Sequence, residues 1–348
     1  MTIVPELPAR YYARMGEILQ RHGVDVAALL QAAGVRPQLF AEPGAMLRLD
    51  QVETLLAEAA RLSGRSDLGF ELGRSLRIST HSVVGYGILS SPTIDYAMRL
   101  TARFFRLLSP TFRMRCRRDA AQAEIRFEPA LPLSHGAFVF HVETIAVAIH
   151  SALYELLQDQ MPSHQLLLSI AEPPHAARYA ELEGARVQFG WTGATGLCLR
   201  LPAAVMDRPP ILADPNALQL AEARCAALLR DAVAEGRVAD WVRMMLREAS
   251  DGLPTLTELA HTLNLSQRTL DRHLQREGQG FRELLAQVRQ ERARDLLAAG
   301  RMTVTQIALE LGYSDAANFT RAFRREAGIS PSEYRLKIEK TSATDLHG

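Results

Sequence analysis

The stretch TLTELAHTLNLSQRTLDRHLQREG, Thr255–Gly278, recurs in altered form as TVTQIALELGYSDAANFTRAFRREAG, Thr303–Gly328. In each copy a short segment with helical apolar spacing leads through a turn to a longer segment, apolar on one face and polar on the other. Ala260 and Ala308 occupy the same place in the two copies, where a second helix crosses too closely for a larger side chain. The pattern predicts two helix-turn-helix units.

The turns of the two copies carry residues suited to ending one helix and starting the next. They read Asn264-Leu265-Ser266 and Gly312-Tyr313-Ser314. We expect Ser266 and Ser314 to be N-caps, because a hydroxyl accepts a hydrogen bond from a free backbone N–H of the first turn. Gly312 suits the left-handed backbone conformation that such a turn often needs.

The segment between the copies, Phe281–Gly300, predicts a connecting helix. Its buried stripe consists of Leu284, Leu285, Val288, Ala293, Leu296 and Leu297, and Gly300 is the expected C-cap. Residues 283–299 would be about 25 Å long at 1.5 Å per residue. Successive major grooves on one face of DNA are about 34 Å apart, so this helix could hold two recognition helices near that spacing.

The duplicated unit, its connector and the closing GISPSEYR, Gly328–Arg335, resemble the DNA-binding domain of the AraC/XylS family over residues 254–337. The first part of the chain resembles the large α+β sensor domain of ornithine-responsive and related AraC-like regulators. Its marks are GFELGRSLRISTHSVVGYGILSSPTIDYAMRL, Gly69–Leu100, and VQFGW, Val187–Trp191. The resemblance implies a sequence-specific, effector-responsive transcription regulator of the activating kind. A repressor, and a regulator controlled by a protein partner, are the alternatives.

Register with the family pattern assigns the residues that would contact DNA. Base edges would be read by Arg268, Asp271, Arg272, Asn318 and Arg321. Arg can pair bidentately with guanine, Asp can accept from cytosine, and Asn can read adenine. Phosphate contacts, which position without specifying sequence, would come from Ser266, Gln267, Arg282, Arg324 and Arg325. The implied partners are a double-stranded DNA operator and RNA polymerase.

The chain before the repeat predicts an α+β domain with a small antiparallel sheet. Helical spacing marks residues 8–22, 25–33, 50–62, 94–107 and 136–158, with Asp50 and Thr93 as expected caps. Alternating apolar residues mark a hairpin of residues 112–117 and 123–128, followed by strands near 165–170 and 197–201. The fold expected for the whole chain is therefore this domain followed by an all-α domain with two helix-turn-helix units.

These patterns divide the chain into four parts. We expect a ligand-sensing and dimerisation domain at residues 1–210, a helical linker at 211–253, the DNA-binding domain at 254–337 and a tail at 338–348. The stretch Asp251-Gly252-Leu253-Pro254 marks the boundary to the DNA-binding domain. Residues 254–340 hold 14 Lys and Arg against 11 Asp and Glu, a net charge of +3, whereas the rest of the chain is net −2. This asymmetry permits nucleic-acid binding without establishing it.

The first 210 residues exceed what dimerisation needs, which favours a small-molecule effector and a homodimer. Polar candidates for effector contacts are His81, Tyr86, Arg103 and His141. Glu143 is a further polar group, but it lies on a different helical face from His141, so the two cannot share a site through local geometry.

Other classes of protein find little support in the sequence. It has no phosphate-binding glycine loop, HExxH or GxSxG motif, and its three scattered cysteines suit neither a metal site nor a disulfide framework. We therefore expect no enzyme, no cofactor and no metal. The apolar stretch 137–157 is interrupted by His141, Glu143 and His150, and no signal peptide is recognisable. The expectation is a cytoplasmic protein with no membrane partner.

Overall fold

The computed structural model describes residues 6–42, 44–158, 161–235, 238–248, 253–263, 265–300 and 302–344. Asp251 and Gly252 of the expected boundary, the turn residue Asn264 and the last four residues of the expected tail lie outside them. The chain forms two compact units, Met1–Cys225 and Ala226–Gly348.

The first unit opens with helices and a small two-stranded sheet. Strand β1 (Glu6–Pro8) pairs antiparallel with β2 (Met46–Arg48), and the helices are α1 (Ala9–Arg21), α2 (Val26–Ala32) and α3 (Leu49–Ser63). The three helices agree with the sequence prediction, but Asp50 is not a cap. Helix α3 begins at Leu49 after Arg48, so Asp50 lies in the first turn, where its charge suits the helix dipole.

Two glycine-rich helices were not predicted, α4 (Leu68–Ser75) and α5 (Ser82–Leu89). Glycine weakens helix propensity, which hid them in the sequence. Helix α6 (Ile94–Phe104) follows and ends in a 3₁₀ turn at Phe105–Leu107. Its expected cap is confirmed, because the Thr93 hydroxyl accepts a hydrogen bond from the Tyr96 backbone N–H.

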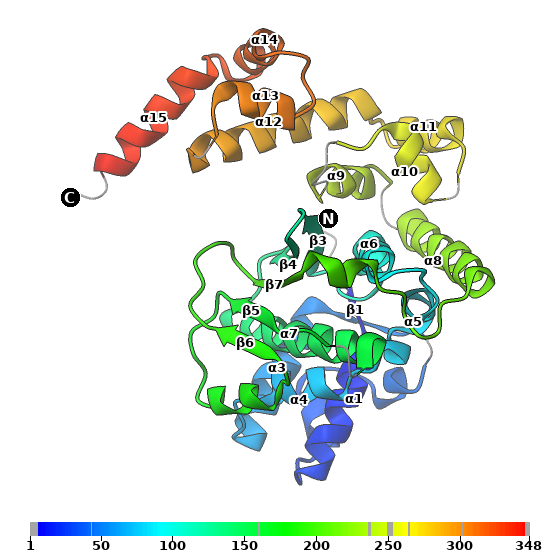
Figure 1. The fold of residues 1–348 in the computed structure, drawn as a ribbon. Helices are drawn as coiled ribbons and strands as arrows, with labels where there is room; N and C mark the ends of the chain where they lie inside the picture. The colour runs from blue at the N-terminus through cyan, green and yellow to red at the C-terminus, as the bar shows by residue number, and fades with distance from the viewer. Residues whose placement is uncertain are drawn as a thin grey trace. The chain divides into compact units, whose positions relative to one another are not determined.

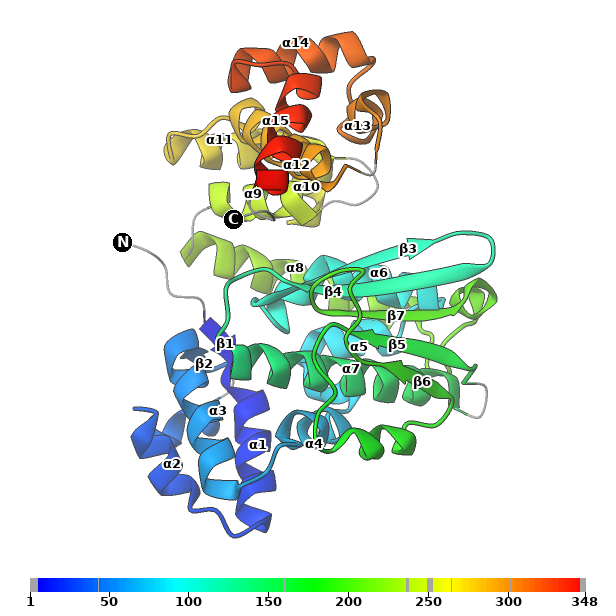
Figure 2. The ribbon, with the colours of Figure 1, turned by 90° about the vertical axis from the view of Figure 1, so that its left-hand side faces the viewer.

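A five-stranded sheet and one long helix complete the first unit (Figure 2). The strand order is β3 (Phe112–Arg118), β4 (Gln122–Pro129), β7 (Leu197–Pro202), β5 (His164–Leu168) and β6 (Ala185–Gln188). The expected antiparallel hairpin and the two later strands are confirmed. Strand β6 was missed, and it pairs parallel with β5, so the sheet is mixed.

Helix α7 (His135–Leu157) lies along the sheet and is the central helix of this unit (Figure 2). By length and composition alone it could cross a membrane, but 61% of its most apolar window is buried inside the protein. Helix α4 packs closely against it through two glycines. A Cβ at Gly69 would lie 2.7 Å from the Phe140 carbonyl oxygen, and one at Gly73 would lie 2.7 Å from the Thr144 carbonyl oxygen. Glycine is therefore required for this approach.

We expect Gly69→Ala to destabilise the first unit by about 1–3 kcal/mol, because the added methyl group forces α4 away from α7. The matched control is Gly136→Ala in the first turn of α7, where a Cβ would meet nothing within 4 Å. That change should be neutral or stabilising by up to about 1 kcal/mol. Urea unfolding of both variants checks the pair, and equal stabilities would contradict the close-packing argument.

The second unit is entirely helical in its described residues. Helix α8 (Pro215–Glu235) contains the division between the units, and α9 (Val238–Glu248) follows. The Glu277 carboxylate accepts hydrogen bonds from the backbone N–H groups of Val238 and Ala239, at 2.7 and 2.9 Å. Arg247 pairs with Glu291 through two hydrogen bonds. Helix α9, which the sequence placed in a linker, is thus held by the helices that follow it.

The remaining helices form the two expected helix-turn-helix units. They are α10 (Leu256–Thr262) with α11 (Gln267–Arg276), and α13 (Val304–Glu310) with α14 (Ala316–Ala327). Helix α12 (Phe281–Ala299) connects them, with one unit at each end, and α15 (Pro331–Thr344) closes the domain (Figure 1). Ala260 and Ala308 are buried as the crossing positions require.

Among the described residues, the caps and turns of these units agree with prediction except at the cap of α14. Gly312 and Gly300 adopt the left-handed conformation, with φ of 74° and 65°. The Ser266 hydroxyl caps α11 by accepting from the Thr269 N–H. Ser314 is not the cap of α14. Asp315 takes that role, accepting from the Asn318 N–H at 2.7 Å.

Candidate DNA interface and internal cavity

The first recognition helix, α11, presents both of its predicted base-reading arginines to solvent. Arg268 and Arg272 are four residues apart, so they share one helical face, and both side chains are exposed. Neither Arg268 nor Arg272 forms a side-chain hydrogen bond or an ion pair with another described residue. Asp271 is half-buried and its carboxylate accepts from the Gln275 amide at 2.9 Å. The guanidinium groups are therefore the available hydrogen-bond donors of this face.

Two predicted phosphate contacts on α11 already have partners. Ser266 is engaged in capping, and the Gln267 amide oxygen accepts from the Thr257 hydroxyl at 3.0 Å. This second bond ties α11 to α10 across the turn. Both side chains are nevertheless exposed, so they lie at the surface where a phosphate would approach.

The second recognition helix, α14, carries a closed polar network. The Asn318 amide group donates to the Ser314 hydroxyl and the Asp315 carboxylate, each at 2.7 Å, and its oxygen accepts from Arg321. The Asn318 backbone N–H lowers the pKa of Asp315, which favours its ionised form. Both N–H groups of the Asn318 amide are thus occupied, so Asn318 must exchange a partner before it can donate to a base, and Arg321 has one of its donors engaged.

The other predicted phosphate residues lie on two different helices of the same unit. Arg324 and Arg325 are exposed on the last turn of α14, where Arg325 lies 3.8 Å from the Glu326 carboxylate. Arg282 is exposed in the first turn of α12. The structure thus brings all ten predicted DNA contacts into one unit and leaves their individual roles as predictions.

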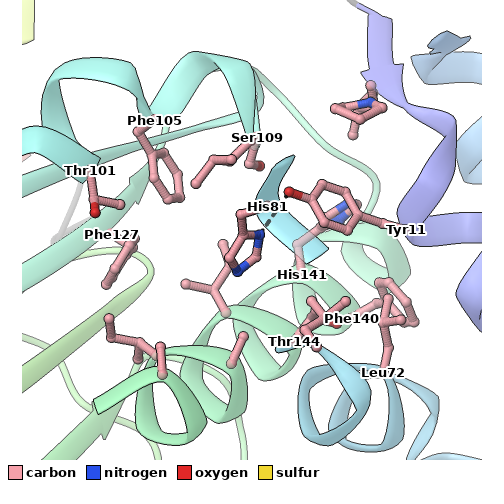
Figure 3. Close-up of a pocket in the computed structure, with 18 of the residues that line it drawn as sticks. Tyr11, Leu72, His81, Thr101, Phe105, Ser109, Phe127, Phe140, His141 and Thr144 are labelled. Atoms are coloured by element: carbon pink, nitrogen blue, oxygen red, sulfur yellow. Dashed lines mark hydrogen bonds between the residues drawn. The ribbon is translucent and has the colours of Figure 1, made fainter. Parts of the chain in front are cut away.

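The first unit contains an internal cavity of about 110 Å³ (Figure 3). His81 and His141 line it, together with aromatic and aliphatic residues from α1, α4, α6, α7 and β4. The other two predicted effector residues do not line this cavity. Tyr86 is 60% exposed, and the Arg103 guanidinium lies 3.6 Å from the Glu222 carboxylate of α8.

The two cavity histidines are each paired with a tyrosine from α1. The Tyr11 hydroxyl lies 2.9 Å from His81 Nδ1, and the Tyr12 hydroxyl lies 2.9 Å from His141 Nε2. Burial lowers the pKa of His81 to about 4 and also lowers that of His141. Both rings are therefore neutral at physiological pH.

A buried carboxylate lies outside this cavity in a cluster that the sequence did not indicate. Glu143 of α7, only 1% exposed, accepts from His175 Nε2 at 2.7 Å and from the Tyr179 hydroxyl at 3.2 Å. The Ser66 hydroxyl lies 3.0 Å from His175 Nδ1. The prediction that Glu143 and His141 have separate surroundings is confirmed. No local pattern joins Ser66 and His175 to Glu143, because more than thirty residues separate each pair.

We expect Glu143→Gln to change the pH dependence of stability. Burial raises the pKa of Glu143 above its value in the unfolded chain, so the folded state binds more protons between the two values. The free energy of unfolding of the wild type should therefore fall, relative to the variant, as pH rises from about 4.3 through the raised pKa. Urea unfolding at a series of pH values measures this difference. Glu183→Gln, at an exposed position, is the control. A constant difference between the wild type and Glu143→Gln would contradict the assignment.

Comparison with known proteins places both units in one family. Residues 23–210 match the family model described as the arabinose-binding domain of AraC transcription regulator, N-terminal, and residues 259–337 match that of a helix-turn-helix domain. The chain is 32% identical to the ornithine utilization regulator of Pseudomonas aeruginosa over 94% of its own length and 96% of the relative's. It is 27% identical to the regulator VqsM of the same species, over 77% and 83% of the two chains.

Among solved structures, the transcriptional regulator CdpR of Pseudomonas aeruginosa is 26% identical. That likeness covers 89% of this chain and 96% of that one, with a TM-score of 0.45. The family match extends over more than half of the chain, and the relative named for ornithine utilization is similar over nearly all of it. The chain therefore belongs to the AraC family of transcription regulators, with a DNA-binding domain of two helix-turn-helix units.

Proposed function

We propose that this chain is a cytoplasmic, homodimeric transcription activator that responds to a small-molecule effector. Effector binding in the cavity of the first unit would alter how α11 and α14 engage a double-stranded DNA operator, and a bound regulator would contact RNA polymerase. The observation that carries this proposal is the combination of an internal cavity in one unit with two exposed recognition helices in the other. The chain would act without enzymatic turnover, as its relatives named as regulators suggest.

The roles of individual residues follow from their surroundings. Arg268 and Arg272 would read base edges without first giving up a partner, whereas Asn318 would first open its network with Ser314, Asp315 and Arg321. The first helix-turn-helix unit would therefore contribute more of the sequence preference. Arg324, Arg325 and Arg282 would contact phosphates, and Ser266 and Gln267 would add neutral contacts beside them.

The test is genome-wide DNA binding by the purified protein, with and without a pool of cellular metabolites. We expect enrichment of one motif with two half-elements about one helical turn apart, and a change in occupancy when metabolites are added. Absence of enrichment in both conditions would refute site-specific binding. Reporter output after deletion of the gene separates activator from repressor, because it falls for an activator and rises for a repressor.

The cavity also bears on the alternative of control by a protein partner. A regulator that responds only to a protein needs no ligand-sized pocket, whereas this unit has one of about 110 Å³ lined mostly by apolar side chains. The name of the relative at 32% identity points to ornithine as a candidate effector. The lining residues do not favour ornithine in this cavity, because none of them is Asp, Glu, Lys or Arg and both lining histidines are neutral.

An enzymatic alternative is favoured by one arrangement, the hydrogen-bonded row of Ser66, His175 and Glu143. A serine, a histidine and a carboxylate in this order can activate a nucleophile. Here Tyr179 also holds the carboxylate, and none of the three residues lines the cavity, which favours an anchoring role for the cluster. We expect the wild type and Ser66→Ala to hydrolyse a chromogenic acetate ester at the same background rate. A rate that falls at least tenfold in the variant would support catalysis.

A further inference from the structure

We propose that the cavity takes a neutral, mostly apolar molecule about the size of one substituted ring, whose single hydrogen-bond acceptor binds the Nε2–H group of His81. This inference rests on the proposed function, since it names the chemical class of the effector. The residues that surround the cavity favour such an effector over a charged amino acid.

The first argument is the charge of the lining. The cavity is lined by 21 residues, and none of them is Asp, Glu, Lys or Arg. Burying an ion without a counter-charge costs several kcal/mol per ion even after the protein relaxes. A diamino acid brings three charged groups, so its burial here is strongly unfavourable. An apolar molecule gains free energy from the same surroundings.

The second argument is the hydrogen-bond state of His81, which lies in the middle of the lining residues (Figure 3). Arg10 can only donate, so its 3.4 Å contact with the Tyr11 hydroxyl makes that oxygen an acceptor. This contact leaves the Tyr11 proton free, and His81 Nδ1, 2.9 Å away, is the acceptor within its reach. We therefore assign the proton of the neutral ring to Nε2, for which no described residue is a hydrogen-bond partner. Nε2–H is thus the donor left for a ligand.

The third argument is that neighbouring polar groups are already committed. His141 Nδ1 lies 2.6 Å from the Ala137 carbonyl oxygen and must donate to it, so Nε2 accepts from Tyr12 and both nitrogens are used. The hydroxyls of Thr101 and Thr144 donate to backbone carbonyls, and the Ser109 hydroxyl shares a 3.3 Å hydrogen bond with that of Thr111. His141 is therefore a structural group of the cavity wall, and His81 is the residue that confers specificity.

The size of the cavity sets the size of the ligand. An engineered apolar cavity of about 150 Å³ in another protein holds benzene. A space of about 110 Å³ that is only partly closed and is lined in part by Phe105 and Phe127 suits one ring, with a short substituent extending toward the open side or accommodated by side-chain movements. Acetophenone is a suitable probe because it combines a ring with one carbonyl acceptor. Ethylbenzene has nearly the same shape without the acceptor.

The experiment measures binding of acetophenone, ethylbenzene and L-ornithine to the full-length chain by calorimetry and ligand-observed NMR. We expect saturable binding of acetophenone, binding of ethylbenzene about three- to tenfold weaker, and no binding of ornithine in the cavity. His81→Phe keeps an aromatic ring but removes the donor, so it should weaken acetophenone about three- to tenfold and leave ethylbenzene unchanged. His135→Phe, at an exposed position on α7, is the matched control and should change neither.

A second variant protects the test against misfolding of the first. Ala148→Phe on α7 places a ring in the cavity and should abolish binding of both aromatic probes while the far-ultraviolet circular dichroism is retained. Three results would overturn the inference. They are ornithine binding that either aromatic probe displaces, failure of both aromatic probes to bind, and an equal loss of affinity for both aromatic probes in His81→Phe. Operator binding is measured separately. If the aromatic probes bind as expected but no cavity ligand alters operator affinity, the effector role fails and the assignment of the cavity stands.

Discussion

Replacing Phe319 with Ala is expected to destabilise the second helix-turn-helix unit by about 3–5 kcal/mol and to abolish operator binding. Phe319 of α14 is only 1% exposed, and its ring lies 5.4 Å from that of Tyr313 and 5.8 Å from that of Phe323. The truncation removes the centre of the cluster that packs α14 against α13. A typical domain is stable by only 5–15 kcal/mol, so a loss of this size unfolds the unit in an appreciable fraction of molecules.

Hydrogen exchange of the full-length chain measures this effect locally, because α13 and α14 should lose protection while the helices of the first unit keep theirs. Leu309→Ala is the matched control, since Leu309 lies on α13 with 62% of its surface exposed. It should change stability by less than about 0.5 kcal/mol. Equal protection in Phe319→Ala and the wild type would show that this ring does not hold the two helices together.

The second unit could be predicted from the sequence because its information is local and duplicated. Apolar spacing marks α11 and α14, and comparison of the two copies fixes where each turn must lie. The prediction of Ser314 as the capping residue of α14 was wrong because Ser314 and Asp315 are neighbours and both side chains can cap. Only the backbone geometry decides between them, and the extra residue in the second copy shifts the start of the helix by one position.

The first unit was less predictable because its decisive contacts are long-range. Helices α4 and α5 are glycine-rich, and the close packing that needs the glycines of α4 involves residues of α7 far along the chain. His81 and His141 both line the cavity, but their partners lie 70 and 129 residues away. No pattern around either histidine shows which ring nitrogen is already used. Tyr86 and Arg103 have the same polar character and sit elsewhere, so residue type alone could not separate the four candidates.

The expected result for Arg272→Ala is a loss of about 1–3 kcal/mol in operator binding together with a relaxed preference at one base pair. Arg272 is exposed on the same face of α11 as Arg268, and no partner among the described residues competes for its guanidinium. A bidentate contact with guanine can therefore form without breaking a protein hydrogen bond. Binding to a panel of operators substituted one base pair at a time, beside random DNA, measures both effects.

Arg325→Ala is the matched control because it removes the same charge from the last turn of the other recognition helix. A phosphate contact carries no sequence information, so this variant should weaken binding to operator and random DNA alike and reduce the salt slope by about one. If Arg272 contributed only its charge, Arg272→Ala would also weaken binding to operator and random DNA alike. Base reading predicts instead a larger loss on the operator than on random DNA, confined to one substituted position. If Arg272→Ala lost the same free energy on both, Arg272 would be a phosphate contact, and Arg268 would be the remaining arginine of α11 that the sequence predicts to read a base.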